Sequence, residues 1–263
     1  MLLNGLMIFF ASLYLLSCES EQVIKAPKEC IEYGVPPFSG TIFIDPNIIT
    51  KNDPTTFTSL SYNGQEIRTM YDRRDGGAWL DLKPYLFPAK YDDGLIIEIQ
   101  VNPEFGSIKI AQAEAEKYAP IIGRLTTELR KDIETVWIHK GLEPFGGGNK
   151  NILIHTDWSL KHYENQGILE ETLVHEASHT SLDSYHSNNI DWLAAQSDDC
   201  KFISQYAEKN PLREDIAETY LTYYVIKYRP ERISSDLKKI IEDAIPNRIK
   251  YFDKQNFNMH PIR

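Results

Sequence analysis

The segment "LVHEASHTSLD" at residues 173–183 carries two histidines four residues apart, with a glutamate between them. Residues four apart lie on one face of an α-helix, so His175 and His179 can direct their imidazoles at a single metal ion. Glu176 is rotated about 100° from His175, which places it beside that ion. A general base for an activated water belongs there. These residue types at this spacing predict a zinc site able to hydrolyse a bond.

A third protein ligand is needed, because a catalytic zinc site has three protein ligands and keeps one position open. Asp183 follows His175 by eight residues, and a continuous helix would separate the two by about 12 Å along its axis. His186 could reach the ion only if the chain turned sharply after His179. His186 stays open as an alternative ligand, and either residue could close a purely structural site.

A better third ligand lies in the segment "NPLREDIAETYLTYYVIKY", residues 210–228. Pro211 and the acidic residues that follow it predict the start of a helix with an apolar run behind them. Glu214 and Glu218 then fall four apart on one face. The first carboxylate can bind the metal, and the second can hold a ligand histidine in one tautomer. The alternative is a solvated acidic helix face.

Together, "HEASH" and the "EDIAE" motif, which begins 35 residues after His179, resemble the gluzincin metallopeptidases, the thermolysin-like group. "EDIAE" is similar to the glutamate helix of lethal-factor-type peptidases. The resemblance covers about residues 165–225. It implies one zinc ion per chain held by His175, His179 and Glu214, with Glu176 as general base and Glu218 behind a ligand histidine. The remainder resembles an uncharacterised family of secreted proteins, which implies no activity.

Gluzincins often carry a tyrosine or histidine that donates a hydrogen bond to the oxyanion of the tetrahedral intermediate. Tyr206, eight residues before Glu214, is the nearest candidate for this catalytic role. Tyr220, Tyr223 and Tyr224 are alternatives. Most of the 15 tyrosines in the chain are expected to be packing residues.

The first 17 residues, "MLLNGLMIFFASLYLLS", are apolar and uncharged. Their length suits the hydrophobic region of a signal peptide better than a membrane span. The motif "LLSC" resembles the bacterial lipobox, which would make Cys18 the lipid-modified first residue of the mature chain. Residues 18–30 would then be a polar tether at the cell envelope. The alternative is plain secretion, with cleavage slightly further along the chain.

Two further cysteines, Cys30 and Cys200, remain once Cys18 is set aside. In an oxidising compartment an even pair favours a disulfide, which would tie the start of the mature chain to its C-terminal half. Two unpaired buried thiols are the alternative, because the sequence does not show which residues lie close together.

The arrangement of apolar residues predicts an α+β protein: a β-rich region over residues 31–105, followed by a mainly helical domain over residues 106–263. The resemblance to gluzincins implies that this second domain is zincin-like. Alternating or short apolar runs predict strands at "SGTIFID", "IRTMYD", "GAWLDL" and "GLIIEIQV". "YNGQ" and "YDDGL" are typical of hairpin turns.

Two later segments bear on substrate binding. "FGGGN" at 145–149 lacks the Gly-Lys-Ser/Thr of a phosphate loop, so we expect a flexible turn there. "NILIHT" at 151–156 could be an edge strand that pairs with an extended peptide. His155 and Trp158 near its end could line a cleft, although a core or surface position is expected for both.

The composition narrows the function further. The net charge is −10 without a long basic block, which argues against a nucleic-acid partner. We therefore expect an extracytoplasmic zinc hydrolase, a peptidase acting on proteins or peptides, whose only link to the membrane is a lipid anchor. The alternatives are a surface binding module with a structural or degenerate zinc site, and a zinc amidase acting on a non-protein amide.

Overall fold

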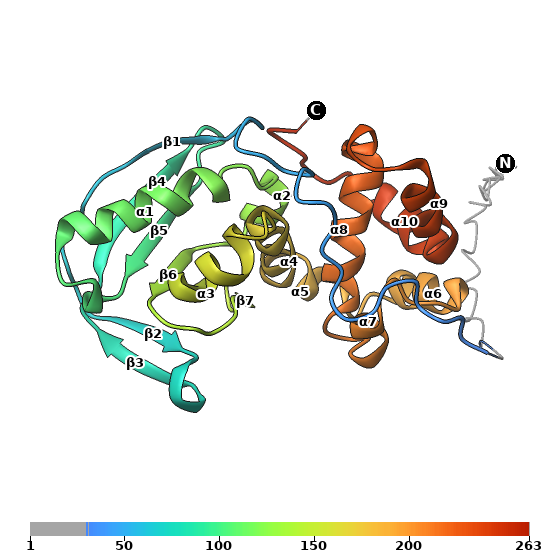
Figure 1. Ribbon diagram of the computed structural model, residues 1–263, viewed down its shortest axis with the longest axis horizontal. Helices are drawn as coiled ribbons and strands as arrows, with labels where there is room; N and C mark the ends of the chain where they lie inside the picture. The colour runs from blue at the N-terminus through green and yellow to red at the C-terminus, as the bar shows by residue number, and fades with distance from the viewer. Residues whose placement is uncertain (1–29, 31, 263) are drawn as a thin grey trace, which may run out of the picture.

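The computed structural model describes residue 30 and residues 32–262, and in this part of the chain six strands form one mixed sheet (Figure 1). In spatial order the strands are β1 (Phe57–Leu60), β4 (Tyr85–Tyr91), β5 (Ile96–Val101), β6 (Thr135–His139), β8 (Asn151–His155) and β7 (Gly146–Gly148). Strands β5, β6 and β8 run parallel, and the other pairings are antiparallel. A separate hairpin contains β2 (Arg68–Asp72) and β3 (Ala78–Leu82).

The helices follow mainly after the first five strands, which confirms the predicted α+β class. They are α1 (Ile108–Ile122), α2 (Thr127–Arg130), α3 (Thr156–Trp158), α4 (Leu169–Ser181), α5 (Asp183–His186), α6 (Ile190–Asp199), α7 (Gln205–Lys209), α8 (Asp215–Tyr228), α9 (Ser235–Ala244) and α10 (Pro246–Asp253). Short 3₁₀ or π segments connect these elements at η1 (Arg74–Gly76), η2 (Pro103–Phe105), η3 (Ser159–Glu164) and η4 (Pro230–Arg232).

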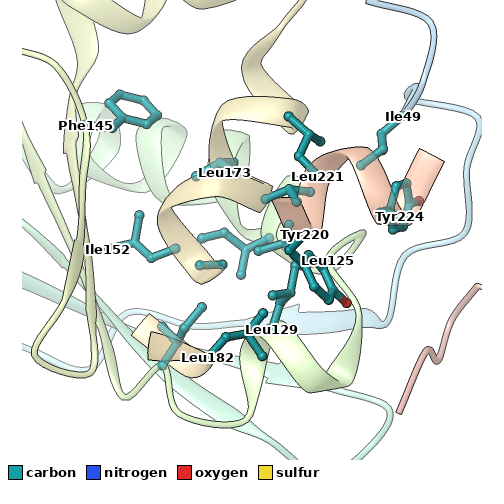
Figure 2. Packing of buried hydrophobic residues seen from close by; sticks show 14 of the residues in the cluster. Ile49, Leu125, Leu129, Phe145, Ile152, Leu173, Leu182, Tyr220, Leu221 and Tyr224 are labelled. Carbon is teal, nitrogen blue, oxygen red and sulfur yellow. The ribbon is translucent and has the colours of Figure 1, made fainter. Parts of the chain in front are cut away.

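Helix α8 is the central helix of the C-terminal half, because 12 of its 14 residues are buried. A helix of that kind is stable only when its whole surface is covered. Leu221 and Tyr220 of α8 are fully buried and lie close to Leu173 of α4 in the main core (Figure 2). This packing holds α4 and α8 together, and the predicted metal ligands lie on these two segments.

The sheet has two differently covered faces. Along β6 and β8, Val136, Ile138, Ile152 and Ile154 point into the main core with the helices. The alternate residues Trp137 and Leu153 form a second, smaller cluster with Met70 of the β2–β3 hairpin. This alternation follows from the two-residue period of a strand. Strand β5 lies in the predicted β-rich region and β6 in the predicted helical domain, and the two strands pair. The sheet therefore extends across the boundary predicted at residue 105.

Several local predictions were wrong. "SGTIFID" forms no strand; it is extended chain whose Ile42 and Ile44 are buried in the main core. Ile42 and Ile44 are therefore covered by core packing without strand pairing, whereas Phe43 between them is exposed. "YNGQ" is not a hairpin turn, because β1 pairs with β4 and the backbone N–H of Asn63 donates to the carbonyl of Leu86. "YDDGL" does join the antiparallel strands β4 and β5.

The edge of the sheet also differs from the prediction. The strand "NILIHT" is β8, an inner strand between β6 and β7, and not an edge. The edge is β7, formed by the glycines that were expected to make a flexible turn. Without side chains these glycines gave no alternating apolar signal, so their pairing with β8 could not be recognised from the pattern.

The N-terminal segment, residues 32–49, crosses the helical half and is drawn in blue beside α8 and α7 (Figure 1). A disulfide joins Cys30 to Cys200, with 5.5 Å between their Cα atoms. Bridges from Gly34 to Lys201 and from Phe38 to Ser204 continue the contact. The expected signal peptide, Cys18 and most of the tether lie outside the described residues. No helix among the described residues is both long and apolar enough to span a membrane.

Candidate metal centre

Three donor atoms from α4 and the start of α8 converge on one point. The Nε2 atoms of His175 and His179 lie 3.2 Å apart. Oε2 of Glu214 lies 3.1 Å from Nε2 of His179 and 3.4 Å from Nε2 of His175. All three side chains are almost fully buried. The structure therefore brings together the three residues that the sequence singled out as ligands.

The spacing of these atoms fits a metal ion. In a tetrahedral site with ligand bonds of about 2.0–2.1 Å, two donor atoms lie about 3.3 Å apart. The three separations observed here are within 0.2 Å of that value. The buried His175, His179 and Glu214 group could thus hold a metal ion.

Each histidine has a carboxylate on the far side of its ring. Nδ1 of His179 lies 2.8 Å from Oδ2 of Asp183, and Nδ1 of His175 lies 3.4 Å from Oε1 of Glu218. A carboxylate at Nδ1 favours the tautomer that leaves the Nε2 lone pair free for a metal. Glu218 lies beside His175 as predicted, but its Oε1 and Nδ1 of His175 do not form the expected hydrogen bond. Asp183 was considered only as a ligand, and its supporting role was missed, although it follows His179 by the same four residues that separate the histidines.

Glu218 is held in place by the N-terminal segment. Its Oε2 accepts a hydrogen bond of 2.9 Å from the backbone N–H of Ile42, and its side chain is fully buried. The backbone N–H of Glu218 donates to the carbonyl of Glu214, which starts α8 and sets the two carboxylates one turn apart. Ile42, which is remote in the sequence, therefore fixes the carboxylate that lies beside His175.

The electrostatics of the group favour positive charge. Burial lowers the pKa of His179, but hydrogen bonds with Asp183 and Glu214 outweigh it and raise this pKa to about 10. Burial raises the pKa of Glu214, yet contacts with both histidines bring it well below its usual range. Asp183 and Glu214 thus stabilise a positive charge at the imidazole of His179, the sign of charge that a metal ion would supply.

A cavity of about 330 Å³ opens beside the three donors. We call it the metal cavity; Glu176, Tyr206, Trp158 and Thr41 are among the residues that line it. The hydroxyl of Tyr206 donates to Oε1 of Glu214 at 3.1 Å. Burial raises the pKa of Tyr206, and the negative charge of the neighbouring Glu214 raises it further. Glu176 and Tyr206 therefore face the same space as the metal group.

The other candidates lie elsewhere. His186 is buried in an aromatic cluster, with Nδ1 2.8 Å from the hydroxyl of Tyr251, and is absent from the metal group. Tyr220, Tyr223 and Tyr224 are buried in the main core. His155 is fully buried and stacks on the ring of His139.

Comparisons of the chain with protein-family models, curated proteins and solved structures find no match. The interpretation of the site therefore depends on its own geometry. That geometry comprises three convergent donors, two carboxylates behind the histidines, and a carboxylate and a phenol that face the same cavity.

Proposed function

We propose that this protein is a zinc-dependent hydrolase, and specifically a peptidase. One observation carries the proposal: the donor atoms of His175, His179 and Glu214 have the mutual spacing of three tetrahedral ligands, and Glu176 lines the cavity beside them. Two imidazoles and one carboxylate are a donor set typical of catalytic zinc.

The residues around the metal group have distinct roles in this proposal. When bound, zinc makes a water molecule more acidic and polarises the carbonyl to be cleaved. Glu176 accepts a proton from the attacking water and returns it to the leaving amine. Tyr206, which holds Glu214 in the resting site, donates a hydrogen bond to the oxyanion of the substrate.

A purely structural metal site fits less well. Such a site is closed by a fourth protein ligand. Within the described part of the chain, the group that could hold a metal has three members. Asp183 and His186, the residues considered for closing it, are engaged with Nδ1 of His179 and with Tyr251. An open fourth position beside a cavity favours catalysis.

A peptide substrate is favoured by the strand at the border of the metal cavity. Gly146 and Gly147 of β7 line this cavity, and β7 is an edge of the sheet. An extended peptide can add to such an edge through main-chain hydrogen bonds, here beside Gly146, because the N–H of Gly148 already donates to Thr180. This supports a peptidase over an amidase that acts on a non-protein amide.

Metal analysis and a peptide digest test the proposal together. Purified protein should contain about one zinc per chain, and zinc should raise its thermal stability. Glu176→Gln should keep the metal but cleave a peptide library about 10²–10⁴ times more slowly. Protein without metal, with no gain in stability on adding zinc, would contradict the proposal; so would cleavage unaffected by Glu176→Gln.

We also propose a location at the cell envelope, on the basis of the apolar N-terminus and the "LLSC" motif. The mature chain should begin at a lipid-modified Cys18 and partition with membranes. Mass spectrometry of the natural protein tests this, since an unmodified N-terminus further along the chain means simple secretion.

A further inference from the structure

A second cavity lies on the opposite face of the sheet from the helices. It has a volume of about 300 Å³ and is lined by Tyr71, Trp79, Trp137, Asn151 and the three glycines of β7. We call it the hairpin cavity, because Tyr71 and Trp79 belong to the β2–β3 hairpin. Its volume is at the lower end of the range for small-ligand sites.

The two cavities share a border. Arg73, Gly146 and Gly147 line both the metal cavity and the hairpin cavity. The guanidinium of Arg73 donates to the carbonyls of Pro144 and Phe145, which joins the end of β2 to the chain just before β7. The edge strand β7 thus lies between the metal centre and the hairpin.

A peptide added to β7 would extend the sheet by one strand. Successive side chains of a strand point to opposite faces of its sheet. One residue of the peptide would then face the metal cavity, and the next would face the hairpin cavity. This step rests on the proposed peptidase function.

The lining of the hairpin cavity is suited to a flat, apolar group. The rings of Trp79 and Trp137 meet edge to face, with 5.5 Å between their centres, and Tyr71 lies 5.3 Å from Trp79. Trp79 is 56% exposed, so it has aromatic surface to offer. The glycine backbone of β7 has no side chains that would keep a ring away. Aromatic rings favour such edge and offset contacts, and the nearby guanidinium of Arg73 adds attraction for a π-face.

We propose that the hairpin cavity is the subsite for an aromatic side chain of the substrate peptide, adjacent in sequence to the residue at the metal centre. It would make the protein selective for peptides that carry Phe, Tyr or Trp at this one position.

Cleavage profiling tests the selectivity. Zinc-loaded wild type, Trp79→Ala and Leu80→Ala would each digest the same peptide library. Leu80 is the matched control, because it neighbours Trp79 on β3 and is not among the residues that line the cavity. Wild type and Leu80→Ala should favour aromatic residues about tenfold at one subsite, and Trp79→Ala should lose that preference. An unchanged profile in Trp79→Ala, or an equal loss in Leu80→Ala, overturns the inference.

A binding measurement gives a result that does not depend on turnover. Glu176→Gln protein would be titrated with acetylated pentaglycine peptides that carry Phe or Ala at the central position. The NMR indole N–H signals of Trp79 and Trp137 should shift with the Phe peptide only. The signal of Trp192, which is buried in the main core, should stay unchanged. Equal responses to both peptides overturn the inference.

The two tests separate this inference from the proposed function. Cleavage of the library without an aromatic preference leaves the peptidase function intact and removes the subsite. Selective binding of the Phe peptide, without cleavage of any peptide by zinc-loaded wild type, supports the subsite and removes the peptidase function.

Discussion

At the scale of single residues, the carboxylates behind the two histidines differ in their surroundings. Glu218 is fully buried and takes a hydrogen bond from Ile42, whereas the side chain of Asp183 is 25% exposed and reaches His179 at 2.8 Å. Asp183 forms a hydrogen bond with its imidazole, whereas Glu218 lies at ion-pair distance from His175; neither belongs to the three donors that could hold a metal ion. Removing either should weaken metal binding while leaving the three donors present.

Four variants should therefore differ in their affinity for zinc. Glu214→Ala should lower it most severely, because it removes a donor. Glu218→Ala and Asp183→Ala should each lower it by about 10–100-fold, the usual effect of losing a partner of a ligand histidine. His186→Ala should leave it nearly unchanged, because His186 contacts Tyr251 instead. Competitive titration with a chelator measures all four.

The opposite order would change the site assignment. If His186→Ala lost zinc while Glu214→Ala kept it, Glu214 would not be the third ligand. If Asp183→Ala bound zinc as tightly as wild type, the hydrogen bond to His179 would have no influence on the metal.

A buried carboxylate away from the metal group should make stability depend on pH. Glu171 on α4 is fully buried, and this burial raises the pKa of its carboxyl from 4.5 to about 8. Between these two values the folded chain holds a proton that the unfolded chain has released. The free energy of unfolding should therefore fall as the pH rises from about 4.5 to 8.

Glu171→Gln keeps the shape of the side chain and removes this titration. The free energy of unfolding of this variant should vary less with pH than that of wild type between pH 4.5 and 8. At pH 8 the variant should be more stable than wild type by roughly 3–5 kcal/mol. Urea denaturation at pH 4.5, 6 and 8 measures the difference. Parallel pH profiles for the two proteins would show that Glu171 titrates normally.

At the scale of elements, the contact between β7 and α4 depends on a missing side chain. A Cβ atom at Gly147 would lie 1.8 Å from the backbone oxygen of Glu176. Glycine therefore lets the edge strand lie directly against the helix that carries His175 and His179. The hydrogen bond from the N–H of Gly148 to Thr180 on the same helix strengthens this contact.

Gly147→Ala should push β7 away from α4. We expect a loss of about 1–3 kcal/mol in the free energy of unfolding, typical of overpacking, together with reduced peptide cleavage, since Glu176 would shift. Gly146→Ala is the matched control, because its Cβ would meet the end of a side chain, the guanidinium of Arg73, and not a backbone atom of α4. Urea denaturation should show a smaller effect for this control; equal effects would contradict the interpretation.

At the scale of the whole molecule, the disulfide closes a long loop around the site. Cys30 and Cys200 are separated by 170 residues. The chain that follows Cys30 continues along α7 and α8 until Ile42 reaches Glu218. The cross-link thus anchors the same segment that holds Glu218 beside His175.

Replacing both cysteines by serine should cost about 2–5 kcal/mol of unfolding free energy, as removal of a native disulfide usually does. Zinc affinity should fall less than in Glu218→Ala, because the carboxylate remains and only its anchoring segment is loosened. Urea denaturation and chelator titration measure the two effects. Reductant should destabilise wild type but leave the double variant unchanged; a response in both would point to another cause.

Features that depend on neighbours a few residues apart could be predicted from the sequence. The four-residue spacing of His175 and His179 on a helix, and of Glu214 and Glu218, follows from helical periodicity alone. The turn "YDDGL" between β4 and β5 is equally local, because Gly94 adopts the positive φ of 87° that glycine tolerates.

Tertiary structure alone decided the features that join distant segments. The convergence of Glu214 with both histidines depends on the packing of α4 against α8, and the anchoring of Glu218 depends on Ile42, 176 residues away. The edge position of β7 and the pairing of Cys30 with Cys200 depend on partners that no local pattern names. Backbone periodicity acts within one helical turn or one strand, whereas strand order, disulfide pairing and the two faces of a sheet are set by long-range packing of the whole chain.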